Sequence, residues 1–479
     1  MLRSEKLEFR QIFPRPGWVE HDPGAIWSTQ IQTAKQVAMK YRNEIAGIGV
    51  TNQRETTIVW DRRTGKPIHN AIVWQDRRTA PIIDELASRG YSSYIRRTTG
   101  LIPDAYFSGP KIKWLLENVP GAKKRAKKGD LLFGTVDTYL VWKLTRGRLH
   151  ATDDSNASRT MIFDINRRSW DQRLLDLLGI PLDMLPEVKS SSGILGYTEK
   201  RVLAREIPIA GLAGDQQAAL FGQAGFERGA AKNTYGTGCF ILLNTGVQAP
   251  KPNPGLVSTI AWSLSDTATY ALEGSVFVGG ALIQWLRDQL GLVKKASDTE
   301  QIARQTPNSG GVFFVPALTG IGAPYWDMYA RGLIIGITRD TTKNQIIRAA
   351  LESICLQTVD ALEAMTEATG RRLRSLRVDG GASVNNFLMQ LQADLLALPI
   401  ERSAIPETTA LGAAFLAGLG IGLWNDLDEL RNLSRVDRVF RPNMPARLRV
   451  DIRRGWKRAV QRALDWARPE SPSRPLHWR

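Results

Sequence analysis

One carboxylate, Asp215, lies where a predicted strand meets a predicted helix, a position well suited to chemistry. The stretch 209–222 reads IAGLAGDQQAALFG, so Asp215 follows a run of small residues and precedes a helical run. Gly211 and Gly214 leave room for another group to come close to the backbone. An aspartate that starts a helix is commonly only an N-cap. Asp215 therefore needs a second feature before it can be assigned a catalytic role.

That second feature is a glycine-rich turn further along the chain. Residues 233–240 read NTYGTGCF, with Gly236-Thr237-Gly238 between two apolar segments. The pattern predicts a hairpin with a tight turn, whose backbone N–H groups can face an anion. A carboxylate near a phosphate-binding turn indicates phosphoryl transfer, in which the acid accepts the proton of the attacking hydroxyl.

Length and composition limit the class of protein. The chain has 479 residues, enough for two or three domains, and 43% of them are hydrophobic. Cys239 and Cys355 show no metal or redox spacing, which favours a reduced, cytoplasmic protein. Residues 1–11 contain no apolar core of a signal peptide. The apolar run 410–424 is too short to span a bilayer, so we expect a buried, closely packed helix there.

The chain is strongly basic, with a formal net charge of +17. Its clearest basic cluster is KKRAKK at Lys123–Lys128, which we interpret as the solvated face of a helix. Nucleic-acid binding is the alternative, but the cluster is short and lacks interleaved aromatic residues. Basic residues recur along the whole chain, and the sequence offers no specific reason for the excess.

Several familiar catalytic patterns are missing from the sequence. It has no Walker A motif, no complete G-x-G-x-x-G, no HExxH and no paired CxxC. Its four histidines do not accompany a candidate nucleophile, so a serine–histidine hydrolase is not expected. They are His21, His69, His150 and His477.

The order of predicted elements indicates two α/β domains with a cleft between them. Polar residues 52–55 follow a short strand, where open α/β sheets place ligands. We place the domains at 1–222 and 223–468, followed by a mobile tail at 469–479. Predicted strands cover 7–13, 45–51, 232–234, 239–244, 269–272, 330–338 and 376–378, and a predicted hairpin joins 56–60 to 70–74. Predicted helices cover 24–40, 109–118, 137–144, 218–221, 279–290, 343–369, 382–396 and 408–418, and 14–23 and 153–158 are predicted loops.

Many stretches resemble the glycerol kinases of the FGGY carbohydrate kinase family. The resemblance runs from about Phe9 to Trp466. Its two longest signatures are YFSGPKIKWLLEN at Tyr106–Asn118 and GLIIGITRDTTKNQIIRAALES at Gly332–Ser353. Shorter matching motifs are GWVEHDP, GVTNQRETTIVW, AIVWQ, NASRTM, GDQQAALFGQ, KNTYGTGCF and APYWD.

The resemblance implies an actin/hexokinase-type fold of two ribonuclease H-like domains. It also implies ATP-dependent phosphorylation of glycerol to sn-glycerol 3-phosphate, with Mg²⁺ bridging the phosphates and Asp215 as the general base. Relatives of this kind are dimers or tetramers, so a homodimer or homotetramer is expected. The residues implied for the substrate are Arg54, Glu55, Trp74, Tyr106, Asp215, Gln216 and Phe277. Those implied for the nucleotide are Thr237, Gly280, Gln284, Gly381 and Asn385; no metal ligand is identified.

These residue types suit the implied roles. Each hydroxyl of a triol both donates and accepts, and Arg54 donates where Glu55 accepts. Trp74 and Phe277 would cover the C–H face, although aromatics in strands more often belong to the core. Gly280 and Gln284 are four apart and share a helical face, which by itself is a weak signal.

Two departures from the family pattern lead to further expectations. Relatives begin with a strand–DxGTT–strand hairpin, which nothing before Leu7 supplies, so we expect the chain as written to fold its C-terminal domain but to phosphorylate glycerol poorly. A misassigned start would explain the difference. Relatives with sugar-phosphate feedback carry a glycine-rich loop where Glu199–Glu206 here has no glycine, so that regulation is not expected.

Three other functions remain open at this point. The chain could phosphorylate another small polyol or a ketose, although Arg54, Glu55, Trp74 and Tyr106 favour glycerol. It could be a catalytically impaired homologue with a binding or regulatory role. Nucleic-acid binding rests on charge alone.

Overall fold

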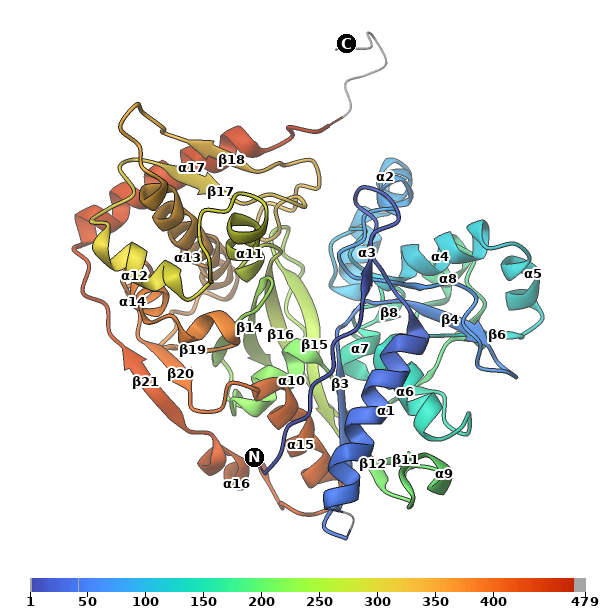
Figure 1. Ribbon diagram of the computed structural model, residues 1–479. Helices are drawn as coiled ribbons and strands as arrows, with labels where there is room; N and C mark the ends of the chain where they lie inside the picture. Colours follow the sequence, from blue (N-terminus) through green and yellow to red (C-terminus); the bar gives the residue numbers. More distant parts are fainter. Residues whose placement is uncertain (1, 42, 469–479) are drawn as a thin grey trace. The chain divides into compact units, whose positions relative to one another are not determined.

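The computed structural model describes residues 2–41 and 43–468, which form a mixed α/β chain with two compact units (Figure 1). Unit 1 runs from the N-terminus to Ala230 and also takes Leu242–Glu273 and Glu407–Arg435. Unit 2 holds Ala231–Ile241, Gly274–Pro406 and the chain from Val436 onward. The prediction of an α/β fold is confirmed. The tail predicted at 469–479 lies outside the described residues.

Unit 1 combines short strands with helices of varied length. Its strands are β1 (Gln11–Ile12), β2 (Glu20–His21), β3 (Ile48–Asn52), β4 (Ile58–Asp61), β5 (Ala71–Ile72), β6 (Leu131–Gly134), β7 (Ala151–Asp153), β8 (Phe163–Asp164), β9 (Ser169–Trp170), β10 (Glu187–Lys189), β11 (Ser192–Tyr197), β12 (Pro208–Gly214) and β15 (Val257–Leu264). Its helices are α1 (Pro23–Lys40), α2 (Ala80–Ser88), α3 (Ser92–Thr99), α4 (Ser108–Asn118), α5 (Ala122–Lys127), α6 (Val136–Leu144), α7 (Asp154–Ala157), α8 (Gln172–Leu178), η1 (Leu182–Met184), α9 (Lys200–Leu203), α10 (Asp215–Gly222), α15 (Thr408–Gly420) and α16 (Leu427–Leu433).

Unit 2 is built around the long helix α13. Its strands are β13 (Ala231–Tyr235), β17 (Phe313–Val315), β18 (Leu333–Ile335), β19 (Leu376–Asp379), β20 (Ile400–Ser403) and β21 (Val436–Phe440). Its helices are α11 (Gly280–Asp288), α12 (Asp298–Gln305), α13 (Lys343–Thr369), η2 (Gly381–Val384), α14 (Asn386–Leu396) and α17 (Ala446–Ala463). Strands β14 (Cys239–Gly246) and β16 (Thr267–Val276) each contribute residues to both units.

Parallel strand pairs bring the candidate residues to one sheet edge in each unit. In unit 1 the strand order is β16-β15-β11-β12-β3, and β12 runs parallel to β3 with Gly214 opposite Asn52. The carboxyl ends of parallel strands share an edge, so the residues that follow Gly214 and Asn52 leave the sheet together. In unit 2 the order is β21-β20-β19-β13, and Thr234 lies opposite Asp379 in the parallel β13–β19 pair.

Glycines let α15 touch the backbone of its neighbours in unit 1. A Cβ at Gly412 would lie 1.8 Å from the carbonyl oxygen of Ala218 in α10, and one at Gly222 would lie 2.1 Å from that of Thr408. A Cβ at Gly49 in β3 would lie 2.1 Å from the Ala413 carbonyl oxygen. The buried helix expected over 410–424 is α15, which packs against the helix that begins with Asp215 but ends at Gly420, before the exposed Leu423.

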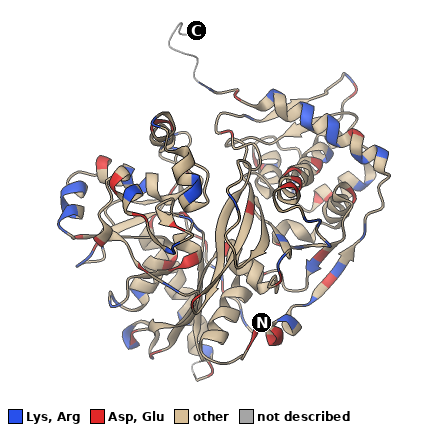
Figure 2. Cartoon of the chain, turned by 180° about the vertical axis from the view of Figure 1, so that it is seen from behind, with Lys and Arg blue, Asp and Glu red and all other residues tan. Residues whose placement is uncertain are grey.

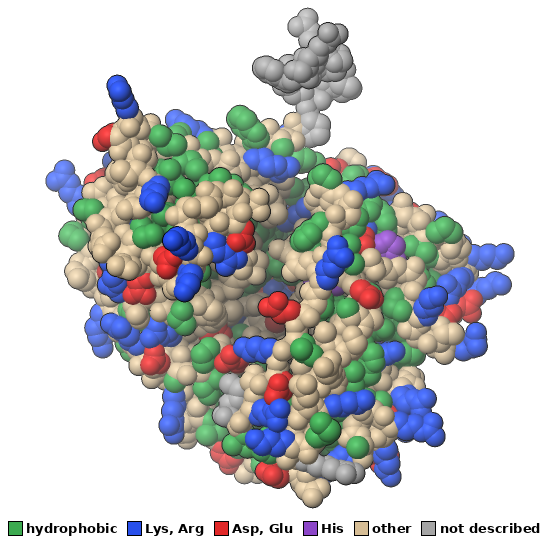
Figure 3. Space-filling view, viewed as in Figure 1, with side chains coloured by type: hydrophobic (Ala, Val, Ile, Leu, Met, Phe, Trp, Pro, Cys, Tyr) green, Lys and Arg blue, Asp and Glu red, His purple; other side chains and the backbone are tan. Residues whose placement is uncertain are grey.

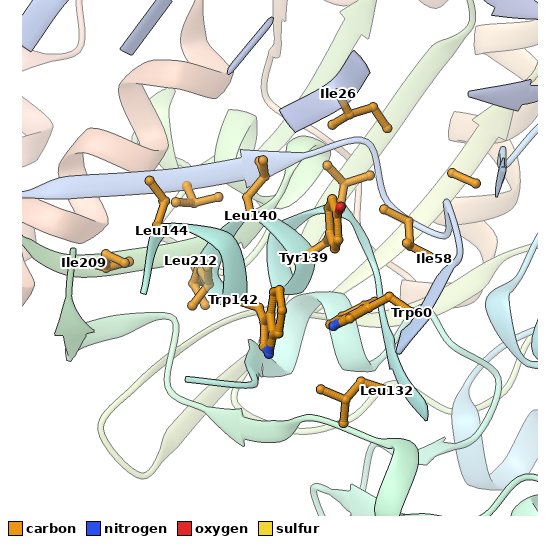
Figure 4. Close-up of a cluster of buried hydrophobic side chains, with 14 of the residues drawn as sticks. Ile26, Ile58, Trp60, Leu132, Tyr139, Leu140, Trp142, Leu144, Ile209 and Leu212 are labelled. Carbon is orange, nitrogen blue, oxygen red and sulfur yellow. The ribbon is translucent and has the colours of Figure 1, made fainter. Parts of the chain in front are cut away.

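A hydrophobic cluster in unit 1 packs against strands β3, β4, β6 and β12 (Figure 4). Trp60, Tyr139 and Trp142 form its aromatic centre, with Trp60 edge-to-face against both neighbours at 5.2 and 5.9 Å between ring centroids. Ile209 and Leu212 of β12 belong to the same cluster. The strand that leads to Asp215 is thus anchored by apolar burial, which is worth about 1.5–3 kcal/mol for each large side chain.

Four local predictions were wrong. The predicted loop 153–158 forms α7, because the Asp153 carboxylate accepts from the backbone N–H groups of Ser155 and Asn156 and caps a short helix. The predicted loop 14–23 contains β2. The strand predicted over 7–13 shrinks to β1. The predicted hairpin is reduced to isolated bridges, because β4 pairs with β6 instead of β5.

The charge of the surface is spread widely. Basic side chains alternate with acidic ones over the face in Figure 3, and Figure 2 shows them gathered along α5 and α17. Ala122 and Ala126 of α5 are buried while Lys123, Lys124 and Lys127 are exposed. This confirms the interpretation of KKRAKK as a solvated helix face. Among the described residues, no helix is long and apolar enough to cross a membrane.

We predict that Gly412→Ala lowers the stability of unit 1, because the added methyl overlaps the Ala218 carbonyl oxygen. Overpacking of this kind costs about 1–3 kcal/mol. The measurement is the melting temperature. Gly381→Ala is the matched control, since nothing lies within 4 Å of a Cβ there. Equal melting temperatures for the two variants would mean that α10 and α15 do not make this contact.

Candidate active site

Asp215 is the first residue of α10 and keeps part of its carboxylate open to solvent. Its Oδ1 accepts from the Gln216 backbone N–H at 2.8 Å and lies 3.1 Å from Nε of Arg54. The side chain is 31% exposed. Behind it, the Gly214 N–H donates to Ser155 Oγ at 2.9 Å, which fixes the start of the helix. An oriented, accessible carboxylate of this kind can accept a proton from a bound hydroxyl.

Arg54 lies across the sheet edge and contacts the backbone where glycine makes room. A Cβ at Gly214 would come within 2.7 Å of the Arg54 side chain, which explains the glycine before Asp215. Nη1 of Arg54 donates to Gln217 Oε1 at 3.2 Å and to Glu273, and Nη2 donates to Glu273 at 3.1 Å and to the Tyr106 hydroxyl at 3.3 Å. The guanidinium is therefore held in one plane.

A second arginine completes a buried ion network. Nε of Arg159 donates to Glu55 Oε1 at 2.6 Å, and its Nη2 donates to Glu273 Oε1 at 2.9 Å. The side chains of Arg54, Glu55, Arg159 and Glu273 are each at most 2% exposed. Buried charges are stable only when paired and hydrogen-bonded, as these are.

The backbone at Glu55 adopts a conformation that disfavours most side chains. Its φ is 59°, in the left-handed region. Its carbonyl oxygen accepts from Lys111 Nζ at 3.3 Å and from Ser108 Oγ at 3.2 Å, both on α4. The loop is thus held by side chains from a distant segment, and strain of this type gathers at functional sites.

Electrostatics keeps the polar groups in defined protonation states. Burial acts to lower the pKa of Arg54, but the carboxylates of Glu273 and Glu55 outweigh it and raise that pKa well above its usual value. Burial and the Glu55 carboxylate raise the pKa of Tyr106 well above that of a free phenol. Burial lowers the pKa of Lys111 to about 7. Arg54 is therefore a fixed cation, and the Tyr106 hydroxyl keeps a proton to donate.

Trp74 and Gln216 complete the set in unit 1. The Trp74 ring is half-buried and meets the Tyr106 ring edge-to-face at 5.8 Å between centroids. Gln216 is 5% exposed and follows Asp215 in α10. The structure thus gathers Glu55, Tyr106 and Asp215 around Arg54, which contacts all three, with Trp74 against Tyr106.

In unit 2, three glycine turns meet around Thr237. Thr237 is exposed between β13 and β14, and its carbonyl oxygen accepts from the N–H groups of Gly279 and Ala281 at the start of α11. The Gly280 N–H donates to the Gly236 carbonyl at 2.9 Å, and a Cβ at Gly280 would lie 2.7 Å from that oxygen. Gly280 is therefore required by packing of the turn, a reason the sequence did not reveal.

The third turn is Gly380-Gly381, which follows β19. Gly380 has φ of +86°, and a Cβ there would lie 2.6 Å from the carbonyl oxygen of Tyr235. The Gly236 N–H donates to the Gly238 carbonyl at 2.9 Å, so that donor serves the turn itself. The backbones of the three turns contact one another, and Thr237 and Gly381 within them are exposed to solvent.

The remaining predicted residues of unit 2 have distinct surroundings. Gln284 is exposed one helical turn after Gly280 in α11. Asn385 caps α14, accepting from the Leu388 N–H at 3.0 Å. Phe277 is 5% exposed and packs edge-to-face on Trp326 at 5.8 Å, as a core residue does.

Sequence reasoning missed Arg159 and Glu273. Arg159 lies in the NASRTM motif and Glu273 in β16, and each was passed over because its neighbours are apolar or small. A charged residue within a strand of otherwise buried residues was the available signal, because such a charge needs a partner. Among the described residues, no group of three or more histidine, cysteine, aspartate or glutamate side chains could hold a metal ion.

Comparisons with known proteins agree over almost the whole chain. It is 60% identical to glycerol kinase 2 of Thermotoga maritima over 462 residues, which cover 96% of this chain and 93% of that protein. Among solved structures, Plasmodium falciparum glycerol kinase with ADP matches at a TM-score of 0.88 and 38% identity, covering 97% of this chain and 94% of that one. A ligand-bound xylulose kinase from Lactobacillus acidophilus matches at 0.82 and 25% identity, covering 95% and 90%.

Two family models match consecutive parts of the sequence. The model of the N-terminal domain of the FGGY family of carbohydrate kinases matches residues 1–222, and that of the C-terminal domain matches residues 231–421. Together they cover most of the chain, and the structural match extends over both of its units. The chain belongs to the FGGY family of carbohydrate kinases.

Proposed function

We propose that this chain phosphorylates glycerol with ATP, giving sn-glycerol 3-phosphate. The observation that carries the proposal is the Asp215 carboxylate, held by Arg54 at 3.1 Å and still open to solvent at the edge of parallel strands. The high identity to a glycerol kinase supports glycerol as the acceptor, because the xylulose kinase is much more distant. A ketose or another polyol is the alternative acceptor.

Asp215 acts as the general base in this proposal. Its carboxylate accepts the proton of the terminal hydroxyl as the oxygen attacks the γ-phosphorus, and ADP leaves. Arg54 and Glu55 orient the hydroxyls of glycerol, Tyr106 donates to one of them, and the Trp74 ring covers the C–H face. A small triol needs such a mixture, since every hydroxyl must both donate and accept when it leaves water.

The nucleotide is assigned to the three glycine turns of unit 2. Thr237 contacts the phosphates, and Gly280, Gln284, Gly381 and Asn385 surround the base and ribose. The exposure of Thr237, Gln284 and Gly381 supports this assignment. Mg²⁺ fits the donor set only as a companion of the nucleotide, because Mg²⁺ usually binds through substrate phosphates and one or two carboxylates. When bound, it offsets the charge of the phosphates.

We predict that Asp215→Asn lowers kcat by about 10²–10⁴-fold while glycerol and ATP bind within a few-fold of the parent, because a general base acts mainly in the transition state. The measurement is glycerol-dependent ADP release, with affinities from calorimetry. Asp288→Asn is the control, since Asp288 is also paired with an arginine, Arg287, but lies in α11. More than about a tenth of the parent kcat would exclude Asp215 as the base.

Glu55→Gln should raise the KM for glycerol about 10-fold or more and leave the KM for ATP unchanged, because a charged acceptor is lost at the polyol. Steady-state kinetics with each substrate varied in turn gives both constants. Xylulose is run beside glycerol as the acceptor. A parent chain that prefers the ketose would refute glycerol as the substrate, and equal changes in both KM values would refute the role of Glu55.

Gln284→Ala should raise the KM for ATP several-fold with no change in melting temperature, because the Gln284 side chain is exposed and supports no packing. Gln289→Ala is the matched control, an exposed glutamine at the end of the same helix. If both variants leave the KM for ATP unchanged, Gln284 does not bind the nucleotide.

A further inference from the structure

Glu273 lies in β16 and is fully buried, and two arginines bind its carboxylate. Arg54 reaches both of its oxygens, and Nη2 of Arg159 reaches Oε1 at 2.9 Å. A buried carboxylate is costly unless ion pairs and hydrogen bonds offset its desolvation. The groups that pair with Glu273 therefore indicate its role.

Glu273 holds the orientation of Arg54. A guanidinium has five N–H donors in a planar fork. In Arg54 the two Nη groups contact Glu273 in a bidentate pair and also contact Gln217 and Tyr106, so that Nε is left pointing at Asp215. Bidentate pairing fixes the plane of the guanidinium, and the plane determines which group Nε faces.

Arg159 orients the carboxylate of Glu55, as Glu273 orients Arg54. Its Nε binds Glu55 Oε1 and its Nη2 binds Glu273, while its Nη1 has no hydrogen-bond partner within the described part of the chain. Nε of Arg54 lies 3.7 Å from Glu55 Oε1 and closes the ring. Positive and negative groups thus alternate around a ring of four side chains, two of which belong to the proposed glycerol site.

We propose that Glu273 and Arg159 are positioning residues for the polyol site. Glu273 orients Arg54 toward Asp215, and Arg159 orients the carboxylate of Glu55. The proposal rests on the proposed function, because glycerol is the ligand that Arg54 and Glu55 would meet. Neither Glu273 nor Arg159 touches the reacting atoms; each acts through its partner.

The first test is Glu273→Gln, which keeps the shape of the side chain and removes its charge. The KM for glycerol should rise about 10- to 100-fold, the loss expected for a hydrogen bond to a charged group, while the KM for ATP stays within about 2-fold. In a crystal structure of the variant, Nε of Arg54 should no longer lie against Asp215. Arg159→Lys, which keeps the charge and loses the fork, should raise the KM for glycerol less.

The matched control is Glu352→Gln in α13. Glu352 is also a buried glutamate, paired with Arg348 at 2.9 Å, but it belongs to unit 2. Both Glu→Gln variants should lower the melting temperature, and only Glu273→Gln should change the KM for glycerol. An unchanged KM for glycerol with Arg54 still facing Asp215 would overturn the proposal and leave Glu273 a structural residue.

Two further outcomes are distinguished in the same experiment. A parent chain that turns over no glycerol refutes the proposed function, while the orientation of Arg54 in crystals of Glu273→Gln still decides the positioning role. If Glu273→Gln does not fold, Arg159→Lys decides it: a rise in the KM for glycerol without a change in the KM for ATP supports the proposal, and unchanged constants overturn it.

Discussion

The unit 1 site depends on a buried ion-pair network between two guanidinium groups and two carboxylates. Arg54 and Glu55 follow β3, Arg159 follows α7 and Glu273 lies in β16, so the ring ties three separate segments of the chain to one point. Such a network is not a large source of net stability, because desolvation offsets much of the attraction. Its value is geometric: only one arrangement satisfies all four charges.

A second constraint is the close approach of backbones. Gly412 and Gly222 let α15 and α10 meet in unit 1, and Gly280 and Gly380 let three turns meet in unit 2. In each case a methyl group would strike a carbonyl oxygen, which cannot move without moving its helix or strand. The glycines therefore determine the positions of the helix N-termini. Asp215 and residues assigned to the nucleotide lie at these N-termini.

Local patterns in the sequence were enough for the long elements and for the position of Asp215 at the start of a helix. Helix α13 begins and ends where its periodicity predicted, with a capping box at Thr342 and Gln345. Asp215 was recognised because small residues, an acid and a helical run follow one another. The pairing of β4 with β6 could not be predicted, because strand partners distant in sequence leave no local mark. Glu273 carried a local signal, a charge within a buried strand, but its partners Arg54 and Arg159 are distant in sequence and could not be identified from it.

Burial of Lys111 makes the folded and unfolded chains bind different numbers of protons. Its amine is buried against the carbonyl oxygens of Glu55 and Tyr106, and its pKa falls to about 7 from the value of 10.5 expected in an unfolded chain. Between these two values the unfolded chain binds more protons, so this group makes the native state more stable as the pH rises from 7 toward 10.5. Unfolding in that range takes a proton from the buffer. The heat of unfolding measured by calorimetry therefore depends on the ionisation enthalpy of the buffer chosen.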